Sequence, residues 1–216
     1  MSALSRRALT AAVAAVGMIA LVAVGWLVWA DRTLDRPHAG WDGAEVVVEL
    51  ERGLSAAAMI ARLDRHGVLA HPKVTAFWLR WFGDAAALHA GEYRFDAPVS
   101  AREVLRRLSA GEVWLHPLTF PEGLSRHEVA DRIVEAGFGD TVAARAAVDD
   151  PAAVTGFDPA ATDLEGYLFP ETYHFARGTR PVEIAGAMVE RFVDVSGDDF
   201  AARAEAVGLT VREAVT

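Results

Sequence analysis

The chain has 216 residues, of which 52 % are hydrophobic and 24 % charged, so it is long and apolar enough to fold around a core rather than to stay disordered. It has no cysteine, which excludes disulfides and thiolate metal sites. Without Arg6 and Arg7, 19 basic residues face 30 acidic ones. This negative balance repels polyphosphates, so nucleic acid is not expected as a partner.

The first predicted element is a membrane-spanning helix over residues 8–30, a stretch without any charged residue. At about 1.5 Å per residue it covers the roughly 30 Å of a bilayer's hydrocarbon core. Arg6 and Arg7 precede it, which places the N-terminus in the cytoplasm, and Trp26 and Trp29 suit the outer interface. The alternative is a cleaved signal peptide. The run exceeds the usual length of such a segment and no clear cleavage site follows, so we expect a retained anchor.

A polar linker at residues 31–43 leads into a predicted small α+β unit at 44–111. Its elements are expected in the order strand 44–50, helix from Ser55 to about Arg65, helix 72–82, strand 91–95, and helix from Ser100 to about Leu108, closed by Gly111.

Three aromatic residues of the helix at 72–82 recur at helical spacing: Trp78, Trp81 and Phe82. They could form a platform on which sugars stack. Aromatic residues at this spacing more often pack in a core, and that is the interpretation we favour.

The second part of the chain, residues 112–216, is also expected to be α+β. A strand candidate at 112–120 precedes a helix whose start is marked by Ser125 and Glu128, the capping-box pattern. Further helices are expected from Asp140 to Pro151 and from about Pro181, Asp198 and Thr210.

Common catalytic and cofactor motifs are missing from the sequence. There is no nucleophile elbow, phosphate-binding loop or dinucleotide fingerprint, and His127 lacks the second histidine of a zincin helix. The seven histidines are read as surface or capping residues, and neither a metal nor an organic cofactor is expected.

Two glutamates remain as candidates for chemistry. Glu165 stands in the run LEGYLFPETYHF (164–175), where aromatic rings around it would remove water and raise its pKa toward that of a proton donor. Glu122 follows Phe120 and Pro121 in a similar, smaller pattern. Proton donation is what glycosidic cleavage requires, because a sugar alkoxide leaves poorly. Either glutamate could instead be a structural carboxylate that accepts backbone N–H groups.

The run LEGYLFPETYHF resembles the signature E-G-[YW]-x-[FW]-P-[DE]-T-[YW] of the endolytic murein transglycosylases, the MltG or YceG-like family. FPEG (120–123) resembles the earlier P-E-G turn of that family, and LHAGEYRF (88–95) resembles the G-x-Y strand of its LysM-like module. The order of anchor, module and catalytic domain agrees over nearly the whole chain.

The resemblance implies a catalytic Glu165. It also implies a pocket shaped by the other motif positions, which are Glu122, Gly166, Tyr167, Phe169, Pro170, Glu171, Thr172 and Tyr173.

The implied domains are a cytoplasmic N-terminus (1–7), the anchor (8–30), a linker (31–43), the LysM-like module (44–111) and the N-terminal part of the catalytic domain (112–216). The implied activity is a lytic transglycosylase of the cytoplasmic (inner) membrane. It would cut between N-acetylmuramic acid and N-acetylglucosamine in nascent peptidoglycan, leave a 1,6-anhydro end and contact peptidoglycan synthases.

Family members continue past this point with a helix carrying an A-S-I-x-E-K-E-like segment, which should begin near Val215 and Thr216. We therefore expect the chain to be C-terminally truncated relative to the family. Two alternatives stay open: a silent wall-binding or scaffold protein, and a muramidase that uses water.

Overall fold

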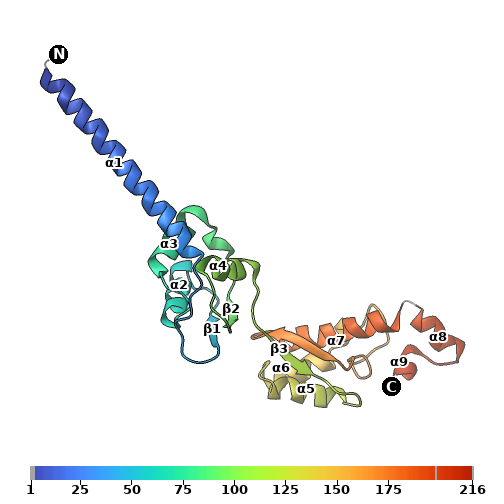
Figure 1. Cartoon of the computed structure of the whole chain (residues 1–216). Coiled ribbons are helices and arrows are strands. Elements are labelled where there is room, and N and C mark those ends of the chain that lie inside the picture. The colour runs from blue at the N-terminus through green and yellow to red at the C-terminus, as the bar shows by residue number, and fades with distance from the viewer. Residues whose placement is uncertain (1–2, 198, 216) are drawn as a thin grey trace. The chain divides into compact units, whose positions relative to one another are not determined.

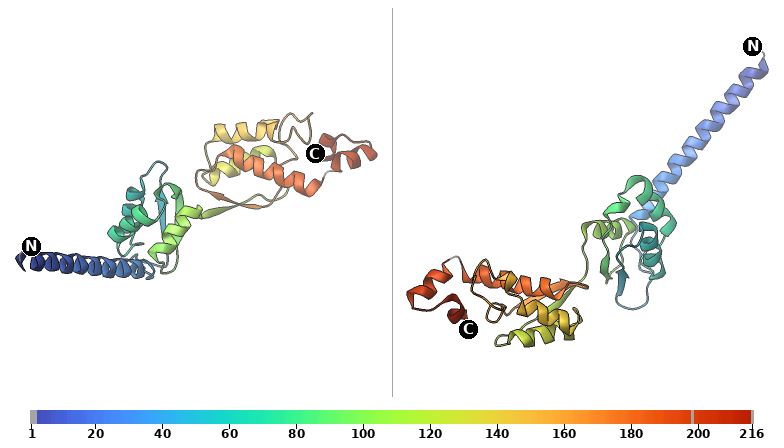
Figure 2. Two further views of the ribbon diagram at one scale, coloured as in Figure 1. Left: turned by 90° about the horizontal axis from the view of Figure 1, so that it is seen from above. Right: turned by 180° about the vertical axis from the view of Figure 1, so that it is seen from behind.

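The computed structural model describes residues 3–197 and 199–215, and the chain divides into an N-terminal unit (1–114) and a C-terminal unit (115–216). Figure 1 labels the elements along the chain, and Figure 2 gives two further views. Each unit combines helices with a two-stranded antiparallel sheet, which confirms the α+β prediction.

The N-terminal unit begins with the long helix α1 (Ala3–Leu34). Among the described residues, one segment, Val13–Leu34, is long and apolar enough to cross a membrane by length and composition. The helix continues four residues past the predicted end at Ala30. Its last turn is stabilised because Leu34 is buried within the unit and the Thr33 hydroxyl donates to the Trp29 carbonyl at 2.7 Å.

The rest of this unit follows the predicted order, and the elements are β1 (Val46–Leu50), α2 (Ala56–Arg65), α3 (Pro72–Phe82), the 3-10 turn η1 (Ala85–Ala87), β2 (Gly91–Phe95) and α4 (Ala101–Ala110). The predicted caps are confirmed, since Ser55 accepts from the Ala58 N–H and Ser100 from the Glu103 N–H. Gly111 ends α4 in the left-handed conformation that glycine adopts without strain.

The core of this unit forms where α2, α3 and α4 pack on the sheet. Val48 of β1 lies opposite Tyr93 of β2, and both are fully buried. Leu63, Leu79 and Leu108 bring the three helices into the same cluster.

The prediction that all three aromatic residues of α3 are core was wrong for two of them. Trp78 is partly buried against the core, but Trp81 and Phe82 are 67 % and 60 % exposed. The core side of α3 is formed by Thr75 and Leu79. Trp81, two residues after Leu79, points away from the core side, whereas Phe82, three residues after Leu79, is the last residue of the helix and extends beyond the core.

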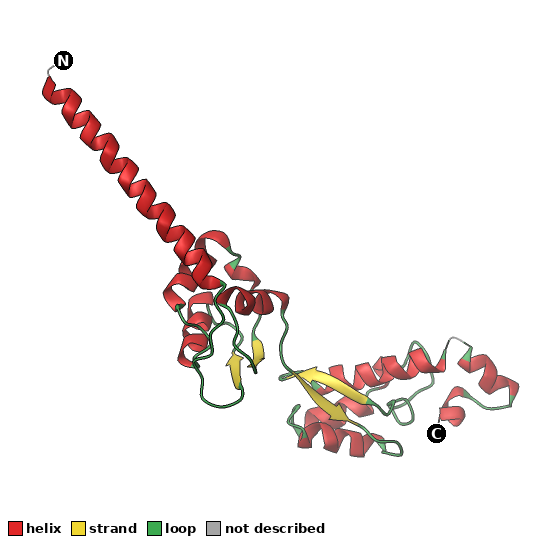
Figure 3. Ribbon diagram, viewed as in Figure 1, coloured by secondary structure: helices red, strands yellow, loops and turns green. Residues whose placement is uncertain are grey.

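The C-terminal unit contains β3 (Leu115–Thr119), α5 (Arg126–Glu135), α6 (Thr141–Asp149), the 3-10 turn η2 (Pro151–Ala153), β4 (Thr172–Ala176), α7 (Pro181–Ser196), α8 (Phe200–Ala206) and α9 (Val211–Val215). Figure 3 shows the strand pair in yellow beside the helices. The expected helix start at Asp198 and the end at Thr216 lie outside the described residues.

Sequence analysis missed β4 and placed the preceding strand at 112–120, longer than β3. The two strands pair antiparallel, with Leu118 opposite Tyr173 and Thr119 opposite Thr172. One face of this pair carries Leu118, Tyr173 and Phe175 into a core with α5, α6 and α7. Residues 172–175 of the aromatic motif therefore belong to strand β4, which positions the preceding loop that contains Glu165.

Candidate active site

Glu165 lies in the loop between η2 and β4, and its neighbours fix that loop. Leu164 and Tyr167 are fully buried, and Leu164 N–H donates to the Val148 carbonyl at 3.0 Å. The Tyr167 hydroxyl donates to a carboxylate oxygen of the buried Asp158 at 2.5 Å. Burial, followed by the contact with Asp158, raises the pKa of Tyr167 to about 12, so its hydroxyl keeps its proton at neutral pH.

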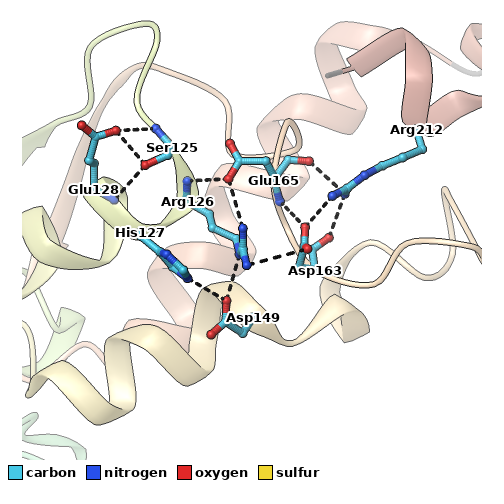
Figure 4. A network of polar contacts seen from close by, with 8 residues as sticks. All are labelled: Ser125, Arg126, His127, Glu128, Asp149, Asp163, Glu165 and Arg212. Carbon is cyan, nitrogen blue, oxygen red and sulfur yellow. Dashed lines mark hydrogen bonds and ion pairs between the residues drawn. The ribbon is translucent and has the colours of Figure 1, made fainter.

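The carboxylate of Glu165 faces the N-terminus of α5. Ser125 and Glu128 form the predicted capping box: each accepts a hydrogen bond from the other's backbone N–H. The N–H of the next residue, Arg126, is one of the first-turn donors without an intrahelical acceptor, and it donates to Glu165 Oε2 at 3.0 Å (Figure 4). The helix start and its dipole thus meet the glutamate directly.

The guanidinium of Arg126 adds a second donor on the same oxygen. Its Nη1 lies 3.4 Å from Glu165 Oε2, and its Nε donates to Asp149 Oδ1 at 2.9 Å. His127 Nε2 lies 3.3 Å from the same Asp149 oxygen. The hydrogen bond from Arg126 is the main cause of the lowered pKa of Asp149. Asp149, on α6, therefore orients the arginine that contacts Glu165.

Asp163 holds the backbone of the glutamate from the other side. Its Oδ1 accepts from the Glu165 N–H at 2.9 Å and from Arg212 Nη2 at 2.8 Å. Arg212, on α9, also donates to the Glu165 carbonyl at 3.1 Å. Burial by itself would raise the pKa of Asp163, but the hydrogen bonds from Arg212 and the Glu165 N–H, with the charge of Arg126, lower it.

A polar groove of about 400 Å³ opens at this point, within the size range of small-ligand sites. It is lined by Gly123, Leu124, Ser125, Arg126, Glu128, Glu165, Gly166, Leu168 and Val215. Gly166 approaches α9 closely: a Cβ at this position would lie 2.7 Å from the Val215 carbonyl oxygen. The groove therefore brings the P-E-G turn, the glutamate loop and the last helix together.

The environment of Glu165 differs from the predicted ring of aromatic side chains. Its side chain is 31 % exposed, and its carboxylate faces the N–H and guanidinium of Arg126. The rings are directed elsewhere because burying them in the core stabilises the unit more than covering a carboxylate would. Tyr167 packs edge-on against Phe192, and Tyr173 stacks on Phe175.

The remaining motif residues lie outside the groove lining. Glu122 is exposed in the P-E-G turn, and Glu171 pairs with Arg191 at 2.7 Å. The Phe169 ring lies under the Arg191 guanidinium, and the Thr172 hydroxyl bonds across the sheet to that of Thr119 at 2.9 Å.

Tyr173 donates to the Phe169 carbonyl at 2.9 Å, and burial, then the charge of Glu171, raises its pKa to about 12. Pro170 is partly buried between Phe169 and β4. These residues hold the segment in place around Gly166 and Glu165.

Sequence reasoning missed the groups nearest the glutamate: Arg126, Asp149, Asp163 and Arg212. Arg126 is 39 positions from Glu165, and only the packing of α5 against the loop brings them together. The capping box gave a partial signal, since it marked where free N–H donors would be.

Over residues 3–197 and 199–215, no three histidine or acidic side chains are arranged to hold an ion. The acidic groups beside Glu165 are instead bonded to arginines.

The fold and the groove define a class of protein: an α+β chain with a candidate N-terminal membrane span and a polar groove in which a helix N-terminus faces a glutamate. The model of the YceG-like family matches residues 48–216, and the chain belongs to that family. This confirms the resemblance seen in the motifs.

Among solved structures, the chain is similar to a YceG-like protein from Listeria monocytogenes, with 22 % identity and a TM-score of 0.38. The match covers 78 % of this chain and 60 % of that protein, so the chain spans about three fifths of its length. The search of curated proteins found no match.

Proposed function

We propose that this chain is a membrane-anchored endolytic transglycosylase that cuts peptidoglycan strands, with Glu165 as its catalytic acid and base. The observation that carries the proposal is the position of Glu165. It lies on the family motif, in a polar groove, on a loop held by buried neighbours and opposite the N-terminus of α5.

In the proposed mechanism, protonated Glu165 donates its proton to the oxygen between N-acetylmuramic acid and N-acetylglucosamine. The bond from this oxygen to C1 breaks as oxocarbenium character develops. The carboxylate then takes the proton of the muramyl C6 hydroxyl, whose oxygen attacks C1 and closes the 1,6-anhydro ring. Glu165 is protonated again, and no water, metal or organic cofactor enters the balance.

In this cycle, Arg126 would stabilise the carboxylate form of Glu165. After the first proton transfer, Glu165 is a carboxylate beside a helix N-terminus, and the N–H and guanidinium of Arg126 stabilise that negative charge. Asp149 keeps the guanidinium in place, and Asp163 fixes the backbone of the glutamate.

The anchor determines where such an enzyme would act. With residues 1–7 in the cytoplasm, the LysM-like module (44–111) and the catalytic part (112–216) lie on the outer side of the cytoplasmic membrane. Tethering raises the effective concentration of the groove near strands still attached to lipid. Nascent glycan is the proposed substrate, and peptidoglycan synthases are proposed partners at the same sites.

The direct test is product analysis with the full chain reconstituted in lipid. Peptidoglycan strands should release 1,6-anhydromuramyl ends with the unmodified protein and none with Glu165→Gln. Glu190→Gln, an exposed carboxylate of α7, is the matched control and should leave the yield unchanged. Equal yields from the unmodified and Glu165→Gln proteins would rule out the assigned role, and binding of strands without any cleavage would favour the scaffold alternative.

A hydrolytic muramidase is the second candidate, because another carboxylate, Glu128, also lines the groove. Hydrolysis needs a base to activate water. Glu128 is engaged in the capping box, where the Ser125 hydroxyl and N–H lower its pKa. Mass spectrometry separates the two reactions, since a hydrolytic product carries one more water than the anhydro form.

A further inference from the structure

Helix α3 presents an aromatic surface that the core of its unit does not use. Trp81 and Phe82 are 67 % and 60 % exposed, and Phe77 is partly buried beside them. Exposed aromatic groups of this size gathered on one helix usually mark a contact surface.

The neighbour of this surface is α1. The rings of Phe77 and Trp26 meet edge to face with centroids 4.8 Å apart, and Trp29 approaches His71 at 6.1 Å. Figure 1 shows α3 beside the end of α1 that enters the unit.

The exposure of α1 changes at this point. From Val13 to Val24 its large apolar side chains are 57–75 % exposed, whereas Ala30 and Leu34 are buried within the unit. If α1 crosses a membrane, it leaves the lipid between Trp26 and Ala30, a rise of about 6 Å. The aromatic surface of α3 then lies at the same depth as that exit.

An apolar groove connects the two helices. Its volume is about 750 Å³, and its lining side chains are all apolar: Ala15, Met18, Ile19, Val22, Ala23, Trp26, Leu27 and Phe77. A neighbouring groove of about 240 Å³ extends the surface to Trp78 and Phe82, and its lining includes one charged residue, Asp31. The apolar side of α1 therefore continues onto α3.

The charge of α3 fits an anionic surface. The helix carries Lys73 and Arg80, both exposed, and no acidic residue, although acidic residues outnumber basic ones in the rest of the exported chain. Basic and aromatic side chains together are typical of segments at the headgroup level of membranes that contain anionic lipid.

We propose that α3 is an interfacial helix: Phe77, Trp81 and Phe82 lie at the headgroup boundary of the membrane that α1 crosses, and acyl chains fill the groove between the helices. Two contacts would then hold the N-terminal unit to the bilayer, and they would limit its rotation about the anchor. The proposal requires that α1 spans the membrane but is independent of the reaction at Glu165.

A sugar-binding platform is the competing use of the same aromatics. Sugar sites combine stacking rings with polar groups that fix the ligand's hydroxyls. The groove beside Phe77 has a purely apolar lining, which suits an acyl chain better than a glycan.

The absence of cysteine from the sequence makes a depth measurement direct. Full-length Trp81→Cys and Phe82→Cys are each labelled with an environment-sensitive fluorophore and reconstituted in phosphatidylethanolamine–phosphatidylglycerol vesicles. Val16→Cys in α1 serves as the reference inside the bilayer, and the exposed Glu49→Cys in β1 as the reference in water.

Labels at 81 and 82 should emit at shorter wavelength than the label at 49. Lipids that carry a quencher near the headgroup should quench them more strongly than lipids that carry it near the acyl end, with the reverse order at position 16. Emission and quenching equal to those at position 49 would overturn the proposal.

Three further outcomes would also overturn the proposal. A blue shift that appears only with added muropeptides would indicate a sugar platform, and a blue shift that scales with the protein-to-lipid ratio would indicate contact between copies. The absence of deep quenching at position 16 would show that α1 does not anchor the chain.

Discussion

Gly166→Ala tests the contact between the glutamate loop and α9. Gly166 has φ +84°, and an added Cβ would lie 2.7 Å from the Val215 carbonyl oxygen, closer than real Cβ contacts. Gly178 is a matched control in the same unit, because its φ is +81° and an added Cβ would meet nothing within 4 Å. Both substitutions put an alanine into a left-handed backbone conformation, but only Gly166→Ala also creates a steric clash.

The magnitudes follow from these geometries. A left-handed conformation costs an alanine about 1–2 kcal/mol, and the reduced freedom of the unfolded chain returns about 0.4–1 kcal/mol. Gly178→Ala should therefore lower the free energy of unfolding by about 1 kcal/mol. Gly166→Ala should cost about 2 kcal/mol more, because overpacking against backbone forces α9 to move. At about 5 °C per kcal/mol for a unit of this size, the expected losses in Tm are about 5 °C and about 15 °C.

The assay is calorimetry of the full chain, followed through the transition of the C-terminal unit. Displacement of α9 should also separate Arg212 from Asp163, so the groove should lose activity together with stability. Equal losses for the two variants would refute the reasoning, because they would show that the Val215 contact contributes nothing.

Three other changes probe the site. Tyr167→Phe removes the donor to the buried Asp158 and should lower the free energy of unfolding by about 2 kcal/mol in denaturant titration, and an unchanged midpoint would contradict this. Arg126→Gln keeps the backbone N–H that donates to Glu165 but removes the guanidinium. The rate of anhydro-product release should therefore fall about tenfold, which corresponds to ~1.4 kcal/mol in the activation barrier. An unchanged rate would exclude a role of the guanidinium in the catalytic cycle. The pKa of Asp163 is lower in the folded chain than its unfolded value of 3.8, so its ionised form stabilises the fold. This stabilisation is complete above pH 3.8 and is lost as the pH falls through the folded pKa. Asp163→Asn should therefore lower Tm at pH 7, and the difference from the unmodified chain should shrink below pH 4; a constant difference would contradict the assignment.

Much of the fold was predictable because its signals are local. Helix starts at Ser55, Ser100, Ser125 and Asp140 are confirmed, each by a side-chain oxygen that accepts a nearby backbone N–H. These interactions span three residues, so the sequence contains both partners. The α+β class and the long apolar helix followed from the same kind of evidence.

Other features depend on partners far away in the sequence. Strand β4 was missed because its pairing with β3 joins Thr119 to Thr172 across two helices, α5 and α6, and the residues between the strands give no local sign of it. Trp81 and Phe82 were placed in the core from their spacing, but spacing does not tell which face of α3 meets the other helices.

The sequence by itself determined that a glutamate stands in a family motif and that a capped helix begins at Ser125, since both are patterns of neighbouring residues. Only the tertiary structure decided what surrounds that glutamate. The rings of Tyr167, Tyr173 and Phe175 pack in the cores, where their burial is favourable, and the carboxylate is left beside Arg126 at the start of α5. Contacts between segments 39 residues apart depend on how whole elements pack, and no local pattern encodes that packing.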